Sequence, residues 1–314
     1  MVAAIAIPGS RPERRHNIMN WTSRRFPREL ILLCALLTLA TACEKKREEF
    51  FSDRPRSTQQ VVVHDVTFHS SALNRDMVYR IVLPVSLATG AKRPVVYLLH
   101  GGGGGFRDWS NYSDVARFAE RGLILVMPEG DESYYTNWAE RPRDRYEDYI
   151  AGDLIWDVEN RFPAASNRAN RAIVGISMGG FGAVKIALRH PELYAFVGGL
   201  SSALDVPSRP FSLKRIRQWS HHRTIFGPWG SGTRHENDPF ALAQSADVAT
   251  APFFYLTCGE QEGLLPANHR FANLLEQRHF HHEFHVVSGG HDWTQWNARL
   301  DDCFSSLLDH LGTR

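Results

Sequence analysis

The sequence predicts an α/β fold in which a mostly parallel central sheet carries helices on both faces. Three observations indicate this fold. Short apolar runs of strand length alternate with segments of helical spacing from residue 94 to residue 311. Two β-rich runs precede them and predict an antiparallel hairpin at one edge of the sheet. The chain has 314 residues, 43% hydrophobic and 22% charged, which is ordinary for a globular protein with a sizeable core.

The expected elements follow one another in the order that such a fold requires. The β-rich runs at 61–68 and 77–83 are separated by a polar turn and predict the hairpin. Continuous apolar runs predict buried parallel strands at residues 94–99, 123–127, 172–176, 194–200, 252–258 and 283–287. Helical spacing predicts helices at residues 112–121, 146–162, 179–189, 267–277 and 294–311. Residues 205–239 show no regular pattern and are expected to form a variable wall or lid.

Residues 1–43 are expected to be a signal peptide rather than part of the fold. Arginines between residues 24 and 28 precede an apolar run at 30–42, which ends in small residues and Cys43. The run is too short to span a bilayer comfortably as a helix. Residues 39–43 resemble a bacterial lipobox, in which the cysteine is lipidated; simple cleavage and release is the alternative. Met19 is a more economical start, and export to a periplasm or cell envelope is expected from either start.

The remaining residues are expected to form a tether and one folded domain. Residues 44–60 are polar and charged, so the domain spans residues 61–314. It contains Cys258 and Cys303, which either pair in an oxidising compartment or remain buried thiols. No spacing of cysteine and histidine suggests zinc. The histidines at 279, 281, 282 and 285 are expected to lie on a solvated or half-buried strand face, and a metal site is the alternative. The net charge of +2 argues against nucleic acid as the main partner, and membrane association is expected only through the lipid anchor.

The most informative stretch is Gly175-Ile-Ser-Met-Gly179, a G-x-S-x-G pentapeptide between an expected strand and an expected helix. In a turn this tight, a Cβ two residues either side of the serine would clash with neighbouring backbone. The serine is held in a strained conformation at the positive end of a helix dipole, with its hydroxyl exposed. Ser177 is therefore the candidate nucleophile, and a glycine-rich turn without a catalytic role is the alternative.

An elbow of this kind belongs to the α/β-hydrolase architecture, in which the chain order is serine, acid, histidine. His291 lies in Gly289-Gly-His-Asp-Trp293, after the last expected strand, and is the candidate general base. The acid is expected just after the strand at 252–258, where the loop offers two glutamates and no aspartate. Glu262 is the predicted acid and Glu260 the reserve, because a glutamate can still accept the histidine N–H and hold its tautomer.

An oxyanion hole needs two backbone N–H groups aimed at one point. Met178, the residue after the nucleophile, is expected to supply one of them. Gly102, in the run His100-Gly-Gly-Gly after the strand at 94–99, is expected to supply the other. Glycine suits this position because the backbone must approach the substrate closely. The glycine run lacks the Lys-Ser/Thr of a phosphate-binding loop, so no nucleotide is expected.

Taken together, these motifs resemble the esterase D-like family of α/β-hydrolases. The likeness covers roughly residues 65–311 and is carried by His100-Gly-Gly-Gly-Gly with Trp109, Met127-Pro-Glu-Gly130, Ser133-Tyr-Tyr-Thr-Asn-Trp138, Gly175-Ile-Ser-Met-Gly-Gly180 and Gly290-His-Asp-Trp293. The family includes tributyrin, feruloyl and acetylxylan esterases, S-formylglutathione hydrolases and mycolyltransferases. The resemblance implies a serine hydrolase of carboxylic esters that needs no metal or cofactor. Glu262 departs from the family, which more often has aspartate there.

The expected function is that of an exported serine carboxylesterase acting on short-chain or carbohydrate-linked esters. Six residues are expected to line the substrate cleft: His100, Gly101, Tyr135, Asn137, Trp138 and Trp293. For the three residues of the long loop, packing of that loop is the alternative. An acyltransferase acting on envelope lipids or glycans is the second hypothesis. A non-catalytic binding protein on a hydrolase scaffold is disfavoured, because nucleophile, base and oxyanion glycines are all present.

Overall fold

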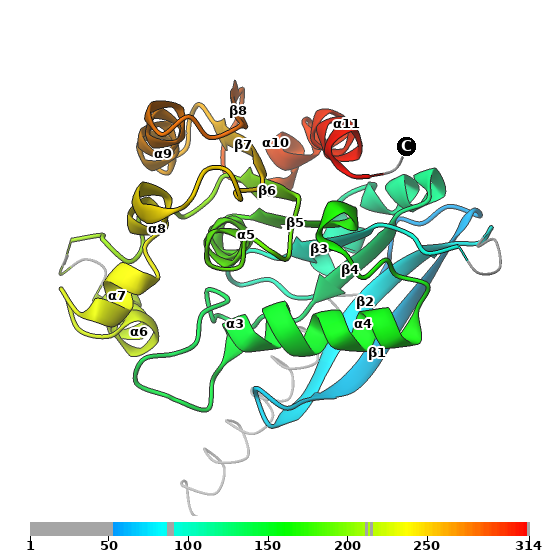
Figure 1. Ribbon diagram of the computed structural model, residues 1–314, viewed down its shortest axis with the longest axis horizontal. Helices are drawn as coiled ribbons and strands as arrows, with labels where there is room; N and C mark the ends of the chain where they lie inside the picture. The colour runs from blue at the N-terminus through cyan, green and yellow to red at the C-terminus, as the bar shows by residue number, and fades with distance from the viewer. Residues whose placement is uncertain (1–52, 87–90, 211–212, 214–215, 313–314) are drawn as a thin grey trace, which may run out of the picture. The chain divides into compact units, whose positions relative to one another are not determined.

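The computed structural model describes residues 53–86, 91–210, 213 and 216–312 (Figure 1). The predicted signal peptide and the tether up to residue 52 lie outside these residues. Eight strands form one sheet in the order β1-β2-β4-β3-β5-β6-β7-β8. The strands are β1 (Val61–Ser70), β2 (Arg75–Pro84), β3 (Val95–Leu99), β4 (Ile124–Pro128), β5 (Arg171–Ile176), β6 (Phe196–Leu200), β7 (Phe253–Gly259) and β8 (His282–Val287).

The strand pairing confirms the predicted fold class. The β1–β2 and β2–β4 pairs are antiparallel, and every pair from β4 through β3 to β8 is parallel. The hairpin register pairs Val61 with Pro84 and Ser70 with Arg75. Because β1 comes first in the strand order and, among the described strands, pairs only with β2, it forms an edge of the sheet. Strands β3 to β6 are buried along their whole length, because both of their faces are covered and each is a continuous apolar run.

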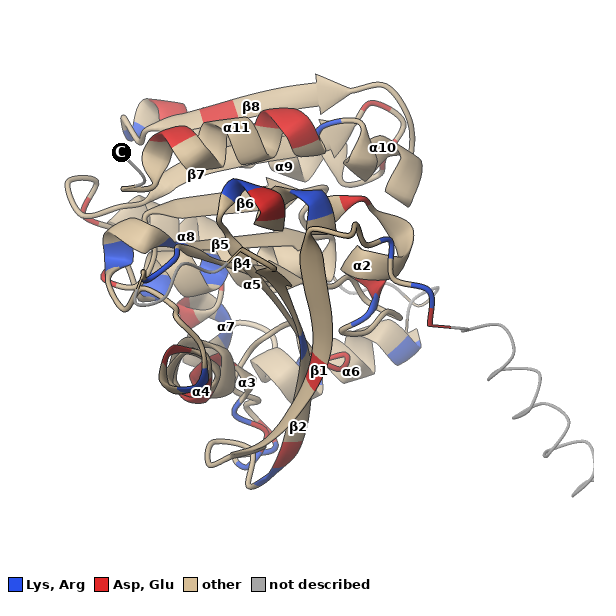
Figure 2. Cartoon of the chain, turned by 90° about the vertical axis from the view of Figure 1, so that its right-hand side faces the viewer, with Lys and Arg blue, Asp and Glu red and all other residues tan. Residues whose placement is uncertain are grey.

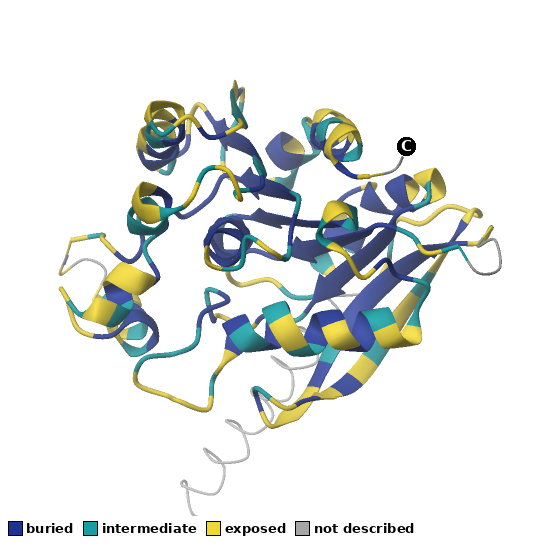
Figure 3. Ribbon diagram, in the orientation of Figure 1, coloured by how far each residue is buried: buried dark blue, intermediate teal, exposed yellow. Residues whose placement is uncertain are grey.

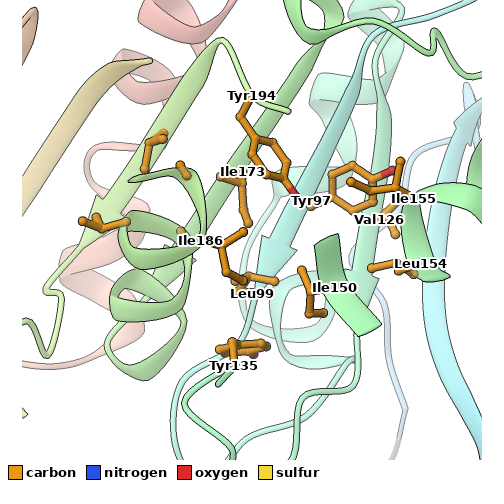
Figure 4. Close-up of a cluster of buried hydrophobic side chains, with 14 of the residues drawn as sticks. Tyr97, Leu99, Val126, Tyr135, Ile150, Leu154, Ile155, Ile173, Ile186 and Tyr194 are labelled. Carbon is orange, nitrogen blue, oxygen red and sulfur yellow. The ribbon is translucent and has the colours of Figure 1, made fainter. Parts of the chain in front are cut away.

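Helices cover both faces of the sheet and divide the core into two main layers. The α-helices are α2 (Asp108–Tyr112), α3 (Tyr146–Asp148), α4 (Leu154–Arg161), α5 (Met178–Arg189), α6 (Ile216–Phe226), α7 (Gly232–Glu236), α8 (Pro239–Ser245), α9 (Leu265–Gln277), α10 (Trp293–Asn297) and α11 (Leu300–His310). Side chains of α4, α5 and α9 share one layer with Tyr97 and Ile173, some of them drawn in Figure 4. Side chains of α10, α11 and the 3₁₀ helix η1 (Val115–Arg121) share the other layer with Val96 and Val174.

Burial and charge follow this layering. The central strands are buried, whereas the helix faces that point away from the sheet are exposed (Figure 3). Charged residues lie mainly on the helices, the loops and the edge hairpin (Figure 2). Within the described part of the chain, no helix is long and apolar enough to cross a membrane. Cys258 and Cys303 are both buried and unpaired, so the structure supports the buried-thiol alternative.

Three expected helices differ from the sequence interpretation. The segment 112–121 is mostly 3₁₀ helix, in which Val115 lies over Phe118 and Ala116 over Ala119, and all four are buried. The helix at 146–162 contains a π turn, η2 (Tyr149–Asp153). The expected last helix is two helices, α10 and α11. The segment 205–239 is not irregular, since it contains α6 and α7, and α8 begins at its end.

Candidate active site

Ser177 lies in the sharp turn between β5 and α5, at the carboxyl end of the parallel strands. Its backbone has φ 54° and ψ −111°, a strained conformation for a residue with a Cβ. Its amide donates to the carbonyl of Leu200, 2.9 Å away, which fixes the turn on β6. A Cβ on Gly175 would lie 2.1 Å from the Gly179 oxygen, and one on Gly179 would lie 2.3 Å from the Leu99 oxygen. Both glycines of the pentapeptide are therefore required by close backbone contact.

His291 comes from the loop after β8 and reaches the elbow serine. Its Nε2 is 2.9 Å from Ser177 Oγ, and its Nδ1 is 2.6 Å from Glu262 Oε2. Gly289 has φ 119°, a conformation that lets the chain turn sharply between the strand and the histidine. The ring of Trp296 meets the imidazole edge-on, with ring centres 5.1 Å apart. The histidine is thus oriented by one carboxylate and one aromatic ring.

Glu262 lies in the loop after β7, and its side chain is almost completely buried. One carboxylate oxygen faces His291. The other, Oε1, accepts from the Ser201 hydroxyl at 2.5 Å and from the Gly259 amide at 2.8 Å. Glu260 is exposed and accepts a hydrogen bond from Ser288, at 2.9 Å, instead. Of the two glutamates offered by the sequence, the structure brings Glu262 to the histidine.

Ser201 and Trp296 belong to this arrangement, and the sequence interpretation missed both. The Trp296 indole N–H donates to Ser201 Oγ at 2.9 Å, and Ser201 in turn donates to Glu262. Ser201 has φ 50°, and its amide donates to Thr257 at 2.7 Å, so the end of β6 is held beside the end of β7. Burial, assisted by the nearby Glu262 carboxylate, raises the pKa of the Cys258 thiol to about 12. That thiol is therefore a neutral neighbour of the acid at physiological pH.

The glycine loop after β3 lies against the elbow. A Cβ built on Gly101 would be 3.5 Å from Ser177 Cβ, so this backbone passes directly beside the serine. The Gly103 amide donates to the Glu132 carboxylate. Gly102, between these two glycines, is exposed, and Met178 begins α5 directly after Ser177. The two amides predicted for the oxyanion hole thus lie on the segments that flank Ser177.

His100 is buried, with 1% of its surface exposed, so its expected role as a substrate contact is wrong. Its Nδ1 is 2.8 Å from the Gly101 carbonyl oxygen, and its Nε2 is 3.2 Å from Glu129. Burial opposes protonation of the ring, but hydrogen bonding to Glu129 outweighs this effect and raises the pKa of His100. Gly101 is buried as well and contacts the elbow. The contacts of His100 with the Gly101 carbonyl and with Glu129 hold the glycine loop in place.

In the long loop at 133–138, Tyr135 and Asn137 pack within the protein and support the site. Tyr135 has no exposed surface, and its hydroxyl donates to the His100 carbonyl at 3.0 Å, so its predicted substrate contact is wrong. The Asn137 amide group is engaged at both ends, donating to Asp148 and accepting from the Glu147 amide. Packing of the loop, the alternative reading, fits both residues.

The two predicted tryptophans are both half-buried among other aromatic rings. Trp138 packs against Tyr146 and His221, with ring centres 6.3 and 5.5 Å away. Trp293 lies beside Trp109 and Trp296, with ring centres 5.4 and 5.2 Å away. Each leaves part of its surface exposed, and their predicted contact with substrate stays a prediction.

A buried ion cluster fastens the elbow helix to this loop. Lys185 of α5 is fully buried and donates to the Glu147 carboxylate at 2.6 Å and to the Tyr135 carbonyl at 2.7 Å. Arg189 and His190 contact the other oxygen of Glu147. Burial would raise the pKa of Glu147, but Lys185, His190 and Arg189 outweigh it and hold that pKa well below its ordinary range. None of this was predicted, because Lys185 looks like an ordinary helix lysine.

The segment that was expected to form a wall packs on the elbow helix. Phe226 of α6 lies against Phe181 of α5, with ring centres 5.7 Å apart, and Tyr134 contacts both rings. Burial lowers the pKa of His222, also on α6, to about 4. Among the described residues, no group of histidine, cysteine, aspartate and glutamate side chains is arranged to hold a metal ion.

The eight-stranded sheet and the serine elbow define an α/β-hydrolase fold. The chain belongs to the Esterase family, described as "Putative esterase", whose model matches residues 70–307. This match confirms the resemblance seen in the motifs. The chain is therefore an enzyme of the carboxylic ester hydrolase class, whose members act by ester hydrolysis or acyl transfer.

Known relatives support this class. An acetyl esterase of Caldicellulosiruptor saccharolyticus is 25% identical over 259 residues, 78% of this chain and 97% of that protein. A diacylglycerol acyltransferase/mycolyltransferase, Ag85A of Mycobacterium leprae, is 25% identical over 71% of this chain and 77% of its own length. The fluorophosphonate-binding serine hydrolase F of Staphylococcus aureus has a solved structure that matches with a TM-score of 0.68 and 25% identity, covering 79% of this chain and 98% of that one.

Proposed function

We propose that this protein is an exported serine carboxylesterase whose nucleophile, base and acid are Ser177, His291 and Glu262. The observation that carries the proposal is the continuous hydrogen-bonded series from Ser177 Oγ through the imidazole to the buried Glu262 carboxylate. The proposal rests further on the elbow conformation of Ser177, which exposes its hydroxyl to an incoming ester. The expected substrates are short-chain or carbohydrate-linked esters, and the acetyl esterase relative supports this class.

The proposed reaction has two acyl-transfer steps. Ser177 Oγ attacks the ester carbonyl carbon while His291 Nε2 takes the hydroxyl proton. The carbonyl oxygen becomes an oxyanion that accepts hydrogen bonds from the amides of Met178 and Gly102. When the tetrahedral intermediate collapses, the alcohol leaves with the proton from His291 and the acyl group stays on Ser177. Water then attacks the acyl-enzyme, with His291 again acting as base, and the acid is released.

Glu262 is proposed to hold the imidazole so that Nδ1 carries a proton and Nε2 is free to accept one. Its carboxylate accepts at one oxygen from His291 and at the other from Ser201 and Gly259, so it cannot rotate without losing hydrogen bonds. The same carboxylate stabilises the imidazolium that forms when Ser177 gives up its proton. The Glu262 amide also donates to the Gly259 carbonyl at 3.2 Å, so a tight turn returns the glutamate side chain to the end of β7.

Acyl transfer to an alcohol is the second candidate. It differs from hydrolysis in the acceptor alone, and the mycolyltransferase relative favours it. Added alcohols should divert the acyl group into a new ester if this candidate is correct. Product analysis with and without a sugar or glycerol acceptor distinguishes the two, since an unchanged acid yield supports hydrolysis.

The principal test uses the mature protein and p-nitrophenyl acetate or butyrate. Wild type should hydrolyse these esters and react with a fluorophosphonate at Ser177, whereas Ser177→Ala should do neither. Full activity in Ser177→Ala would exclude the proposed nucleophile. The predicted export and lipidation are tested separately: after a high-salt wash that removes peripherally bound protein, wild type should stay with the membranes and Cys43→Ser should not, and equal retention of both would contradict the lipid anchor.

A further inference from the structure

Positive charge in the folded domain is concentrated on one segment. Residues 206–235 contain six lysine and arginine residues and no aspartate or glutamate. The rest of the chain from residue 53 onwards contains 21 basic and 29 acidic residues. The net charge of the whole chain hides this asymmetry, because an acidic body offsets a basic lid. Among the described residues of this segment, Arg234 is buried and Arg209 pairs with Asp205, so Arg217 and Arg223 carry its exposed positive charge, which favours an anionic partner.

The basic segment is mounted beside the nucleophile. The carbonyls of Thr224 and Ile225, at the end of α6, accept from the amides of Glu140 and Ala139 at 3.0 and 2.8 Å. Phe226 packs on Phe181, four residues after the nucleophile on the elbow helix. In Figure 1, α6 and α7 lie together at the edge of the folded domain beside α8, outside the sheet. The segment is therefore fixed on the elbow helix that begins after Ser177.

The two faces of α6 differ sharply. His222, Ile225 and Phe226 recur at helical spacing and are buried against the body of the protein. Ile216, Arg217, Ser220 and Arg223 are exposed, and at about 100° per residue they fall on the opposite face.

Large apolar side chains are exposed on this same segment. Leu213, Ile216 and Trp229 are 76%, 54% and 55% exposed. Together with Arg217 and Arg223 they form what we call the lid surface. Arg223 pairs with Glu140 at 3.1 Å, whereas Arg217 forms no ion pair with any described residue.

We propose that the lid surface docks on an anionic lipid bilayer. The outward face of α6 carries Ile216, Arg217 and Arg223, and exposed Leu213 and Trp229 lie just before and just after this helix. Basic and large apolar side chains exposed together are typical of segments that lie in the headgroup region of membranes. The arginines are drawn to the negative surface potential, and the apolar side chains enter the boundary between headgroups and acyl chains. A soluble polyanion would use the arginines but would leave Leu213, Ile216 and Trp229 exposed to water. The apolar side chains therefore favour a lipid surface over a soluble polyanion.

This docking is separate from the predicted anchor at Cys43 and does not depend on the proposed chemistry. The test therefore uses the mature chain, residues 43–314, carrying Cys43→Ser, so that neither a lipid anchor nor the apolar run of the signal peptide contributes. Binding is measured by vesicle flotation with phosphatidylcholine alone and with phosphatidylcholine mixed with phosphatidylglycerol. Binding should be strong only to the vesicles that contain phosphatidylglycerol, and it should weaken as salt is added.

Two double variants separate charge from apolar insertion. Arg217→Gln with Arg223→Gln should weaken vesicle binding about fivefold per arginine, or about 30-fold together. Ile216→Ser with Trp229→Ser should also weaken it, and should abolish the change in tryptophan fluorescence that accompanies insertion. Matched controls carry the same changes elsewhere: Arg121→Gln with Arg270→Gln, and Val286→Ser with Trp156→Ser. All four original residues are exposed, and the controls should bind like the parent.

Three results would overturn the proposal. The first is equal binding to vesicles with and without phosphatidylglycerol. The second is vesicle binding that the control pairs reduce as much as the lid pairs. The third is binding of dextran sulfate that matches vesicle binding and is unaffected by Ile216→Ser with Trp229→Ser, which would identify a site for soluble polyanions instead. Circular dichroism and thermal melting of each variant confirm that a loss of binding is not a loss of folding.

Discussion

Replacing Glu262 by glutamine should leave the shape of the site intact and remove most of its activity. The loss of activity is expected because three hydrogen-bond donors face the two oxygens of the Glu262 carboxylate. Oε1 faces the Ser201 hydroxyl and the Gly259 amide, and Oε2 faces His291 Nδ1. A glutamine must place its oxygen toward Gly259, because a backbone amide can only donate. Its NH₂ group then faces the histidine.

A donor at that position requires Nδ1 to become an acceptor, so the imidazole proton moves to Nε2. An Nε2–H group cannot take the proton of Ser177. In serine hydrolases this tautomer error costs about ten-thousand-fold in kcat, and we expect a loss of that order with KM nearly unchanged. The assay is steady-state hydrolysis of p-nitrophenyl butyrate by purified Glu262→Gln, with active sites counted by fluorophosphonate labelling over long incubation.

Glu260→Gln is the matched control, since Glu260 is exposed and bonded to Ser288 rather than to the histidine. It should keep kcat within a few-fold of wild type. The reasoning would be refuted if Glu262→Gln retained a large part of wild-type kcat, or if Glu260→Gln lost as much as Glu262→Gln did.

Three further predictions concern the supports of the site. Ser201→Ala removes one donor to the Glu262 carboxylate, so the free energy of unfolding should fall by about 1.5–3 kcal/mol, measured by urea denaturation, and kcat should fall with it; unchanged kcat would make Ser201 merely structural. Lys185→Met removes the buried cation that faces Glu147 and should cost about 3–5 kcal/mol of stability, whereas Lys92→Met, on an exposed lysine outside the site, should cost almost nothing. Because the folded-state pKa of Glu147 lies well below its ordinary 4.5, its contribution is present above that pH and is lost as the pH falls. The stability gap between wild type and Glu147→Gln should therefore be widest near neutral pH and shrink in acid, and a gap that widened in acid would contradict this assignment.

Much of the site could be predicted because its chemistry is tied to local sequence. The elbow needs glycine at 175 and 179 for reasons that operate within one turn, and His291 follows a strand and two glycines that turn the chain. The strands were located to within about two residues, since parallel strands buried on both faces are continuous apolar runs. Only one face of α6 is buried, so its apolar residues recur less regularly along the sequence, and this helix was not predicted.

The errors at the site have a common cause. Tyr135 was expected at the cleft because aromatic residues on long loops often contact ligands, yet its ring lies in the core against Gly130 and Gly182. His100 was expected at the cleft because it opens the glycine motif, yet it supports that loop from below. Whether a polar or aromatic side chain in a loop points inward or outward depends on neighbours distant in the chain.

The sequence by itself determined the fold class, the candidate nucleophile, the candidate histidine and the pair of glutamates that were candidates for the acid. These features depend on periodicity, chain order and local steric limits, all of which are written within a few consecutive residues. Only the tertiary structure decided between Glu262 and Glu260, brought Ser201 and Trp296 to the acid, and enclosed Lys185 with Glu147. Each of those contacts joins residues separated by tens of positions in the chain. The contacts of Glu262 form because the sheet brings its strand ends together, and the contact of Lys185 with Glu147 forms because α5 and α3 pack against each other.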